Sequence, residues 1–167
     1  AVARLVFAPY ELPDPDQLNR YLREVRVAVE AVPGVRETAY SCAPPLQGSC
    51  FGMPMQIANR PTVDRANRQG GFFKVVSPSY FPTLGIRILK GRALSDRDTR
   101  SAPPALIINE RFARRYFPDQ DPIGRQVTYR REGQDSATRT VVGVVSGMKH
   151  DLFDLESQPH VFVPIGT

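Results

Sequence analysis

The fold of this chain is decided by residues 77–125, which open with the segment SPSYFPTLGI (77–86). Ser77 is predicted to cap a helix of about two turns, because its hydroxyl can accept a backbone N–H of the first turn. Pro78 suits the first helical position, where its missing N–H costs nothing, and Gly85 suits a left-handed stop. The segment therefore predicts a short helix that packs one apolar face against a core.

The same stretch continues with PPALIINERFARRYFP (103–118). Its apolar run at 105–108 has the length of a strand buried on both faces, and Asn109 can cap the helix that follows. One side of that helix is apolar and carries Phe112, Ala113, Tyr116 and Phe117. The other side is basic and carries Arg111, Arg114 and Arg115. We interpret the basic side as a solvated helix face rather than a patch for anionic lipid or nucleic acid.

A longer helix is predicted upstream, from Pro15 to Val32, with Asp14 as its N-cap. Its apolar residues recur at three- and four-residue spacing and are Leu18, Tyr21, Leu22, Val25, Ala28, Val29 and Val32. Strands are expected before this helix, at residues 4–8, and after it, at residues 35–41. A strand, a crossover helix and a second strand of this size form a right-handed βαβ unit.

Further strands are predicted where polar and apolar residues alternate or where short apolar runs occur, at 51–57, 71–76, 126–130, 138–146 and 161–164. Pro54 cannot donate to a ladder and places the first of these at a sheet edge. Residues 58–70 are expected to form a loop. We expect 4–8, 35–41 and 138–146 to meet in one sheet, with the long helix across one face.

The composition is that of an ordinary globular domain. The 167 residues are 41% hydrophobic and 23% charged, and 16 prolines with 12 glycines indicate many turns and short elements. The formal net charge of +5 is spread along the chain without a basic block, which argues against nucleic-acid binding. No apolar run reaches the roughly 18 residues of a spanning helix, and the first residues do not have the order of a signal peptide.

No catalytic, cofactor-binding or metal site is predicted. His150 and His160 lack a partner ligand or nucleophile pattern, and surface or turn-stabilising roles are expected for both. Gly70-Gly71 leads into a strand rather than a helix, so it is not a phosphate loop. The acidic pairs in the turns, Asp96 with Asp98 and Asp119 with Asp121, are expected to form caps and turns without an ion.

Cys42 and Cys50 are the two cysteines, and they are too few for a four-ligand zinc site. In an oxidising compartment they could form a disulfide that closes a small loop, whereas in a reducing one they would be thiols. The residues themselves do not choose between these states.

Several short motifs, in their order and spacing, resemble one family. They are Val32-Pro33-Gly34-Val35, Tyr80-Phe81, Gly91-Arg92, Tyr116-Phe117-Pro118, Asp121-Pro122-Ile123-Gly124, Val142-Gly143-Val144-Val145 and Val163-Pro164. Together they resemble the MacB-like periplasmic core domain of FtsX-type ABC transporter permeases. The resemblance implies an α+β fold with a porter-like, βαβ-containing lobe formed by 1–76 and 139–167. A β-rich, sabre-like lobe at 77–138 would be inserted into it.

The resemblance also implies a function. Such a domain is non-catalytic, lies on the periplasmic side of the inner membrane and couples movement of the permease's membrane helices to the handling of substrate or partner outside. ATP hydrolysis would lie on a separate cytoplasmic ATPase, and a periplasmic adaptor or a second copy would be further partners. The alternative is a small soluble two-lobed binding protein or enzyme with a pocket between its lobes. The family usually continues beyond the position of Thr167 with another strand and helix, so we expect this chain to expose an uncovered sheet edge or face and to self-associate.

Overall fold

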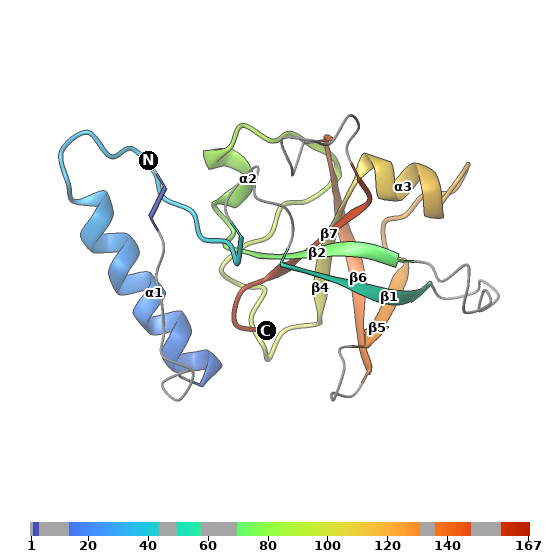
Figure 1. Ribbon diagram of the computed structural model, residues 1–167, viewed down its shortest axis with the longest axis horizontal. Helices are drawn as coiled ribbons and strands as arrows, with labels where there is room; N and C mark the ends of the chain where they lie inside the picture. The colour runs from blue at the N-terminus through green and yellow to red at the C-terminus, as the bar shows by residue number, and fades with distance from the viewer. Residues whose placement is uncertain (1, 4–13, 44–49, 58–69, 131–135, 148–157) are drawn as a thin grey trace.

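The computed structural model describes residues 2–3, 14–43, 50–57, 70–130, 136–147 and 158–167. Its elements are, in chain order, α1 (Pro15–Glu30), β1 (Phe51–Ile57), β2 (Gly70–Val76), α2 (Tyr80–Thr83), β3 (Ile88–Gly91), β4 (Ala105–Asn109), α3 (Glu110–Tyr116), β5 (Gln126–Arg130), β6 (Ser136–Val145) and β7 (His160–Pro164). The fold is mixed α and β, and all of these strands belong to one sheet (Figure 1).

Six of the strands close into a ring in the order β6-β4-β7-β2-β1-β5, because β5 pairs back with β6. The long strand β6 makes this closure. Its residues 136–140 pair with β5 and its residues 143–145 pair with β3, while β4 lies along its other edge. We call these six strands the ring. A closed ring leaves few unpaired backbone groups at its edges, which favours a stable, monomeric sheet.

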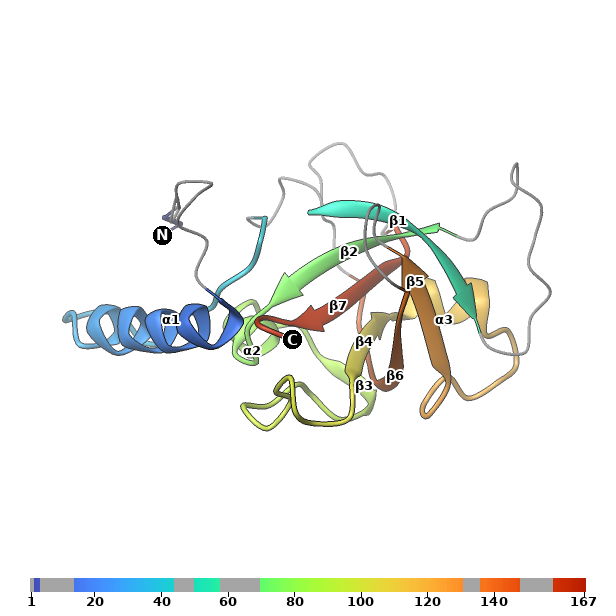
Figure 2. The ribbon, with the colours of Figure 1, turned by 90° about the horizontal axis from the view of Figure 1, so that it is seen from below.

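Side chains fill the inside of the ring. Residues of β1 alternate between buried and exposed, and Met53, Met55 and Ile57 point inward. They pack with Phe73, Leu106, Ile108, Val127, Val141, Val161 and Val163 from the other strands. Phe112 and Tyr116 of α3 join this cluster, so α3 covers part of the ring (Figure 2). The ring is therefore a packed core and not a pore.

A second core lies on the outer face of the sheet. It contains Tyr80 and Phe81 of α2 together with Val76, Leu94, Ile107, Val145 and Phe162. The Phe81 and Phe162 rings meet edge to face at 5.1 Å. Gly85 ends the α2 segment with a φ of 66°, which confirms the predicted left-handed stop.

Residues 14–43, which we call the arm, contain α1 and the extended segment after it. Asp14 caps α1 as predicted, because its Oδ1 accepts the N–H groups of Asp16 and Gln17 at 2.8 and 3.4 Å. The helix ends at Glu30, two residues before the predicted end. Figure 1 shows α1 standing beside the sheet rather than lying across a face of it. Among the described side chains of α1, Leu22 alone is buried.

The predicted strand at 35–41 is wrong. Within it, Ser41 makes a single antiparallel bridge with Val76, and the rest is extended without strand pairing. Side chains hold its backbone instead: Ser77 Oγ accepts the Tyr40 N–H at 2.9 Å, and Ser79 Oγ donates to the Thr38 carbonyl at 2.7 Å. The expected sheet of 4–8, 35–41 and 138–146 is therefore wrong in its second member, while 4–8 lies outside the described residues.

Ser77 is also not the cap of the following helix. The helix α2 starts at Tyr80, spans one turn, and its N-cap Ser79 makes no capping side-chain hydrogen bond. The Ser77 hydroxyl, predicted to cap a helix, accepts the Tyr40 N–H instead, because this backbone group has no strand partner and competes for it. By contrast, Asn109 caps α3 as predicted, accepting the Phe112 N–H at 2.9 Å.

Most other strand predictions are confirmed. The strands β1, β2, β4, β5, β6 and β7 lie within two residues of their predicted limits. Pro54 is not on an edge strand, since β1 lies between β2 and β5. However, β5 pairs only with residues 55–57, so Pro54 sits where β1 has β2 as its one neighbour. The missing N–H of Pro54 therefore breaks no ladder on the β5 side.

The ring draws on all three chain segments that the resemblance assigned to lobes. Strands β1 and β2 precede residue 77, β4 and β5 lie within 77–138, and β7 follows residue 138. The strand β6 itself crosses the 138/139 boundary. The sheet therefore does not divide at these boundaries. Of the loop expected at 58–70, Gly70 begins β2, and the other residues lie outside the described part.

Candidate functional site

The described residues hold no group of three or more His, Cys, Asp or Glu side chains that could bind a metal ion.

His160 was expected at the surface or in a turn, and this is wrong: it begins β7 and is buried. Its N–H donates to Asn109 Oδ1 at 3.0 Å, and its ring lies 5.5 Å from that of Phe72. The parallel pairing of β7 with β2 buries it, and this pairing joins segments far apart in the sequence. His150 lies outside the described residues.

The turn aspartates have structural roles. Asp98 is buried and forms a two-pronged ion pair with Arg92, with N–O distances of 2.7 and 2.9 Å. It also accepts the Ser95 N–H at 2.7 Å. The Arg92 hydrogen bonds hold the pKa of Asp98 below its usual value. Asp121 accepts the Ile123 N–H at 3.2 Å, and Asp119 takes a φ of 56° in the turn after α3.

Cys42 and Cys50 are joined by a disulfide, with their Cα atoms 5.7 Å apart. The bridge lies where the arm meets the sheet. The Cys42 N–H donates to the Val75 carbonyl and the Cys50 N–H to the Phe73 carbonyl, both at 3.1 Å. Together with the Tyr40 and Thr38 contacts, these bonds fix residues 38–42 to residues 75–79. We call this set of contacts the hinge contacts.

One hydrogen bond holds the arm together internally, and another connects it to the rest of the chain. Tyr40 Oη donates to the Leu22 carbonyl at 2.7 Å, which ties the extended segment to α1. Asn19 Nδ2 donates to the Gly166 carbonyl at 3.5 Å and links α1 to the residues that follow β7. Polar contacts thus connect the helix to the rest of the chain. Of the apolar stripe on α1, only Leu22 is buried among the described side chains.

Two buried polar groups on the outer face of the sheet lack partners within the described structure. Lys74 of β2 has no exposed surface, and its Nζ makes no hydrogen bond. Burial lowers the pKa of Lys74 to about 8. The Tyr80 hydroxyl likewise makes no hydrogen bond, and burial raises the pKa of Tyr80 to about 12. Both residues adjoin Phe162, Lys74 through strand register and Tyr80 through a ring contact at 6.2 Å.

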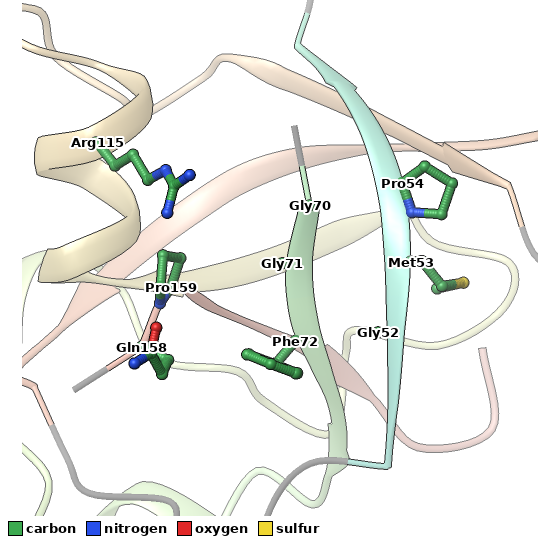
Figure 3. A pocket seen from close by; sticks show the side chains of 9 residues that line it. All are labelled: Gly52, Met53, Pro54, Gly70, Gly71, Phe72, Arg115, Gln158 and Pro159. Atoms are coloured by element: carbon green, nitrogen blue, oxygen red, sulfur yellow. The ribbon is translucent and has the colours of Figure 1, made fainter. Parts of the chain in front are cut away.

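A hollow of about 390 Å³ lies where β1 and β2 meet α3 and the start of β7 (Figure 3). Its lining residues are Gly52, Met53, Pro54, Gly70, Gly71, Phe72, Arg115, Gln158 and Pro159. In Figure 3, Arg115 points from α3 toward Pro159, and Phe72 projects from β2 toward the same side. Arg115 is exposed on α3, as its place on the predicted basic side indicates, but no sequence pattern predicts the hollow beside it. One sequence signal distinguishes Arg115 from Arg114. Arg114 lies four residues after Glu110, at the helical spacing of an ion pair, whereas Arg115 does not.

No helix in the described part of the chain is long and apolar enough to cross a membrane. Solved structures with a similar fold include a periplasmic region and an extracellular domain. The periplasmic region of MacB from Actinobacillus actinomycetemcomitans aligns with a TM-score of 0.57 at 15% identity, covering 87% of this chain and 55% of that one. The extracellular domain of the noncanonic ABC-type transporter YknZ from Gram-positive bacteria aligns at 0.55 and 20% identity, covering 84% and 60%.

A domain of a putative permease protein from Porphyromonas gingivalis aligns with a TM-score of 0.54 at 19% identity, covering 83% of this chain and 54% of that one. This chain therefore spans a little over half the length of these structures. No curated protein matches it. The model of the MacB-like periplasmic core domain matches residues 5–167, and the chain belongs to this family of ABC transporter permease domains.

Proposed function

We propose that this chain is the non-catalytic extracytoplasmic module of an ABC transporter permease in the inner membrane, where it couples movement of membrane helices to the handling of substrate or partner outside. The observation that carries the proposal is the family match over residues 5–167. Its expected partners are the permease's own membrane helices and, through them, an ABC ATPase. A periplasmic adaptor or a second copy would bind on the outer side.

Within this proposal, the arm belongs to the membrane-proximal, porter-like lobe and the ring to the outer, β-rich lobe. This division replaces the boundaries at residues 77 and 138 with one near the disulfide. Movement of α1 would reach the ring through the hinge contacts, because residues 38–42 are bonded to residues 75–79 at several points. The Cys42–Cys50 disulfide would keep these segments in register.

The coupling role can be tested in the parent permease, reconstituted in vesicles with its ATPase. The double substitution Ser77→Ala and Ser79→Ala removes both side-chain hydrogen bonds to residues 38–40. We expect it to lower ATP turnover by the assembly while the chain stays folded. Thr99→Ala, which removes an exposed hydroxyl pair with Ser101, is the matched control. Equal turnover in both variants would contradict coupling through the hinge contacts.

The location can be tested separately. Arg114 is exposed on α3, so an Arg114→Cys permease should react with a membrane-impermeant maleimide in intact cells. Labelling that requires lysis would overturn an extracytoplasmic position.

The proposal also places ATP hydrolysis on another domain, so the isolated chain should neither bind nor hydrolyse ATP. Calorimetric binding of ATP in the low micromolar range would favour a soluble binding protein or enzyme instead.

A further inference from the structure

The hollow beside β2 exists because its floor lacks side chains. Gly52 of β1 and Gly70 of β2, both at exposed positions of their strands, leave bare backbone where other residues would fill the space. Gly71 faces the core, since a Cβ there would lie 2.6 Å from Met55 Cε. Gly52 faces the hollow, and a Cβ there would meet nothing closer than the Phe72 ring at 3.9 Å. The floor thus has room for a flat group lying against the sheet.

The wall of the hollow is apolar. Phe72 leaves 42% of its surface exposed, although its ring is already supported by that of His160 at 5.5 Å. Pro54 and Pro159 add rigid apolar surface on either side of β2. An exposed aromatic ring beside a hollow of this size is typical of a ligand site, because binding removes that ring from water without rearranging the fold.

One cation stands over this apolar surface. Within the described structure no carboxylate forms an ion pair with Arg115, and its guanidinium carbon lies 5.5 Å from the Tyr116 ring centroid. The neighbouring Arg114 instead pairs with Glu110 at 2.9 Å. The Tyr116 hydroxyl donates to the Gly70 carbonyl at 2.6 Å, so the residue beneath Arg115 is itself tied to the floor. A planar guanidinium held in this way favours a carboxylate, which it can bind with two parallel hydrogen bonds.

We propose that this hollow binds a small apolar carboxylate, about the size of a capped aromatic amino acid. The apolar group would lie on the glycine floor against Phe72, and the carboxylate would bind Arg115. The site is independent of the hinge contacts, since none of its lining residues belongs to residues 38–42 or 75–79.

The test uses two probes that differ only in charge, N-acetyl-phenylalanine and N-acetyl-phenylalaninamide, each titrated into the whole chain and followed by two-dimensional NMR. We expect saturable shifts of the Gly71 and Phe72 amides with the acid, and binding weaker by about tenfold or more with the amide, because a charged hydrogen-bond pair is lost. Arg115→Gln should abolish the difference between the probes, whereas Arg114→Gln should keep it.

A second variant tests the shape of the site. Gly52→Leu should fill the hollow and abolish binding of both probes, whereas Gln56→Leu adds the same side chain to the exposed positions of β1 outside the hollow and should leave binding unchanged. The proposal is overturned by equal binding of acid and amide, by equal losses in the Arg114 and Arg115 variants, or by no saturable shift with the acid. Melting curves of each variant separate loss of binding from loss of fold.

Discussion

The ring and the arm carry equally clear apolar patterns, but only the ring buries them. Phe73 and Leu106 have no exposed surface, because each strand of the ring has neighbours on both edges and side chains of the opposite wall across the interior. In the arm, Tyr21 and Val29 of the α1 stripe are 42% and 39% exposed. The comparison indicates that a periodic pattern marks a face that needs a partner, and that the partner is supplied by distant parts of a chain or by another molecule.

The largest expected effect is in the ring. Phe117, at the end of α3, is 5% exposed and belongs to the core cluster of the ring. Its phenyl centroid lies 6.4 Å from that of Phe112. Phe117→Ala should lower the free energy of unfolding by about 3–5 kcal/mol, since it removes a large buried ring and leaves a cavity. Arg114→Ala should lower it by less than about 0.5 kcal/mol. Denaturant titrations of both variants check this, and equal effects would mean that the helical phase of α3 is wrong.

The next effect concerns the buried amine of the ring. The pKa of Lys74 is about 8 in the folded chain and 10.5 in its ordinary state, so between these pH values the unfolded chain binds more protons. Stability of the wild type should therefore rise as the pH increases from 8 to 10.5, by about 3 kcal/mol at most. Lys74→Met should be more stable than the wild type at pH 7 and should lose this rise.

Lys90→Met is the matched control, because Lys90 is exposed and lies 3.9 Å from Asp121. It should leave both the stability and its pH dependence nearly unchanged. Urea titrations at pH 7, 8.5 and 10 measure the two variants. A wild-type stability that is flat across this range would mean that Lys74 keeps its ordinary pKa.

A smaller effect is expected at the junction of the two regions. The disulfide closes a loop of eight residues, and replacing both cysteines with serine should cost about 2–3 kcal/mol by loop entropy. If the arm is connected mainly through this junction, the double variant should also speed hydrogen exchange at residues 38–42 more than in the ring. Uniform exchange throughout the chain would show that the junction does not separate the two regions. Mass spectrometry of the wild type with and without reductant establishes the oxidation state.

The weakest effect should come from the exposed face of α1. We expect the chain to self-associate through this face, because Tyr21 and Val29 leave apolar surface in water. Val29→Glu should shift the chain toward the monomer in light scattering without lowering its melting temperature by more than a few degrees. Gln17→Glu, at an exposed position of the first turn, is the control. A wild type that is monomeric at all concentrations would contradict this expectation.

The sequence determined the local features that need only neighbouring residues. The caps Asp14 and Asn109, the left-handed Gly85 and most strands follow from hydrogen-bonding groups and alternation within a few positions. The apolar side of α3 also follows from spacing alone, since Phe112 and Tyr116 lie one turn apart. The family resemblance came from the same kind of information, namely short motifs in a fixed order.

The tertiary structure alone decided the features that depend on non-local pairing. Closure of the ring requires β6 to pair with both β4 and β5, and burial of His160 and Lys74 requires β7 to lie parallel to β2. Ser77 binds residue 40 instead of capping a helix because that segment has no strand partner. The hollow beneath Arg115 arises only where β1, β2, α3 and the residues before β7 meet. Periodicity reports which side of an element is apolar, but pairing energies between distant segments decide what covers it.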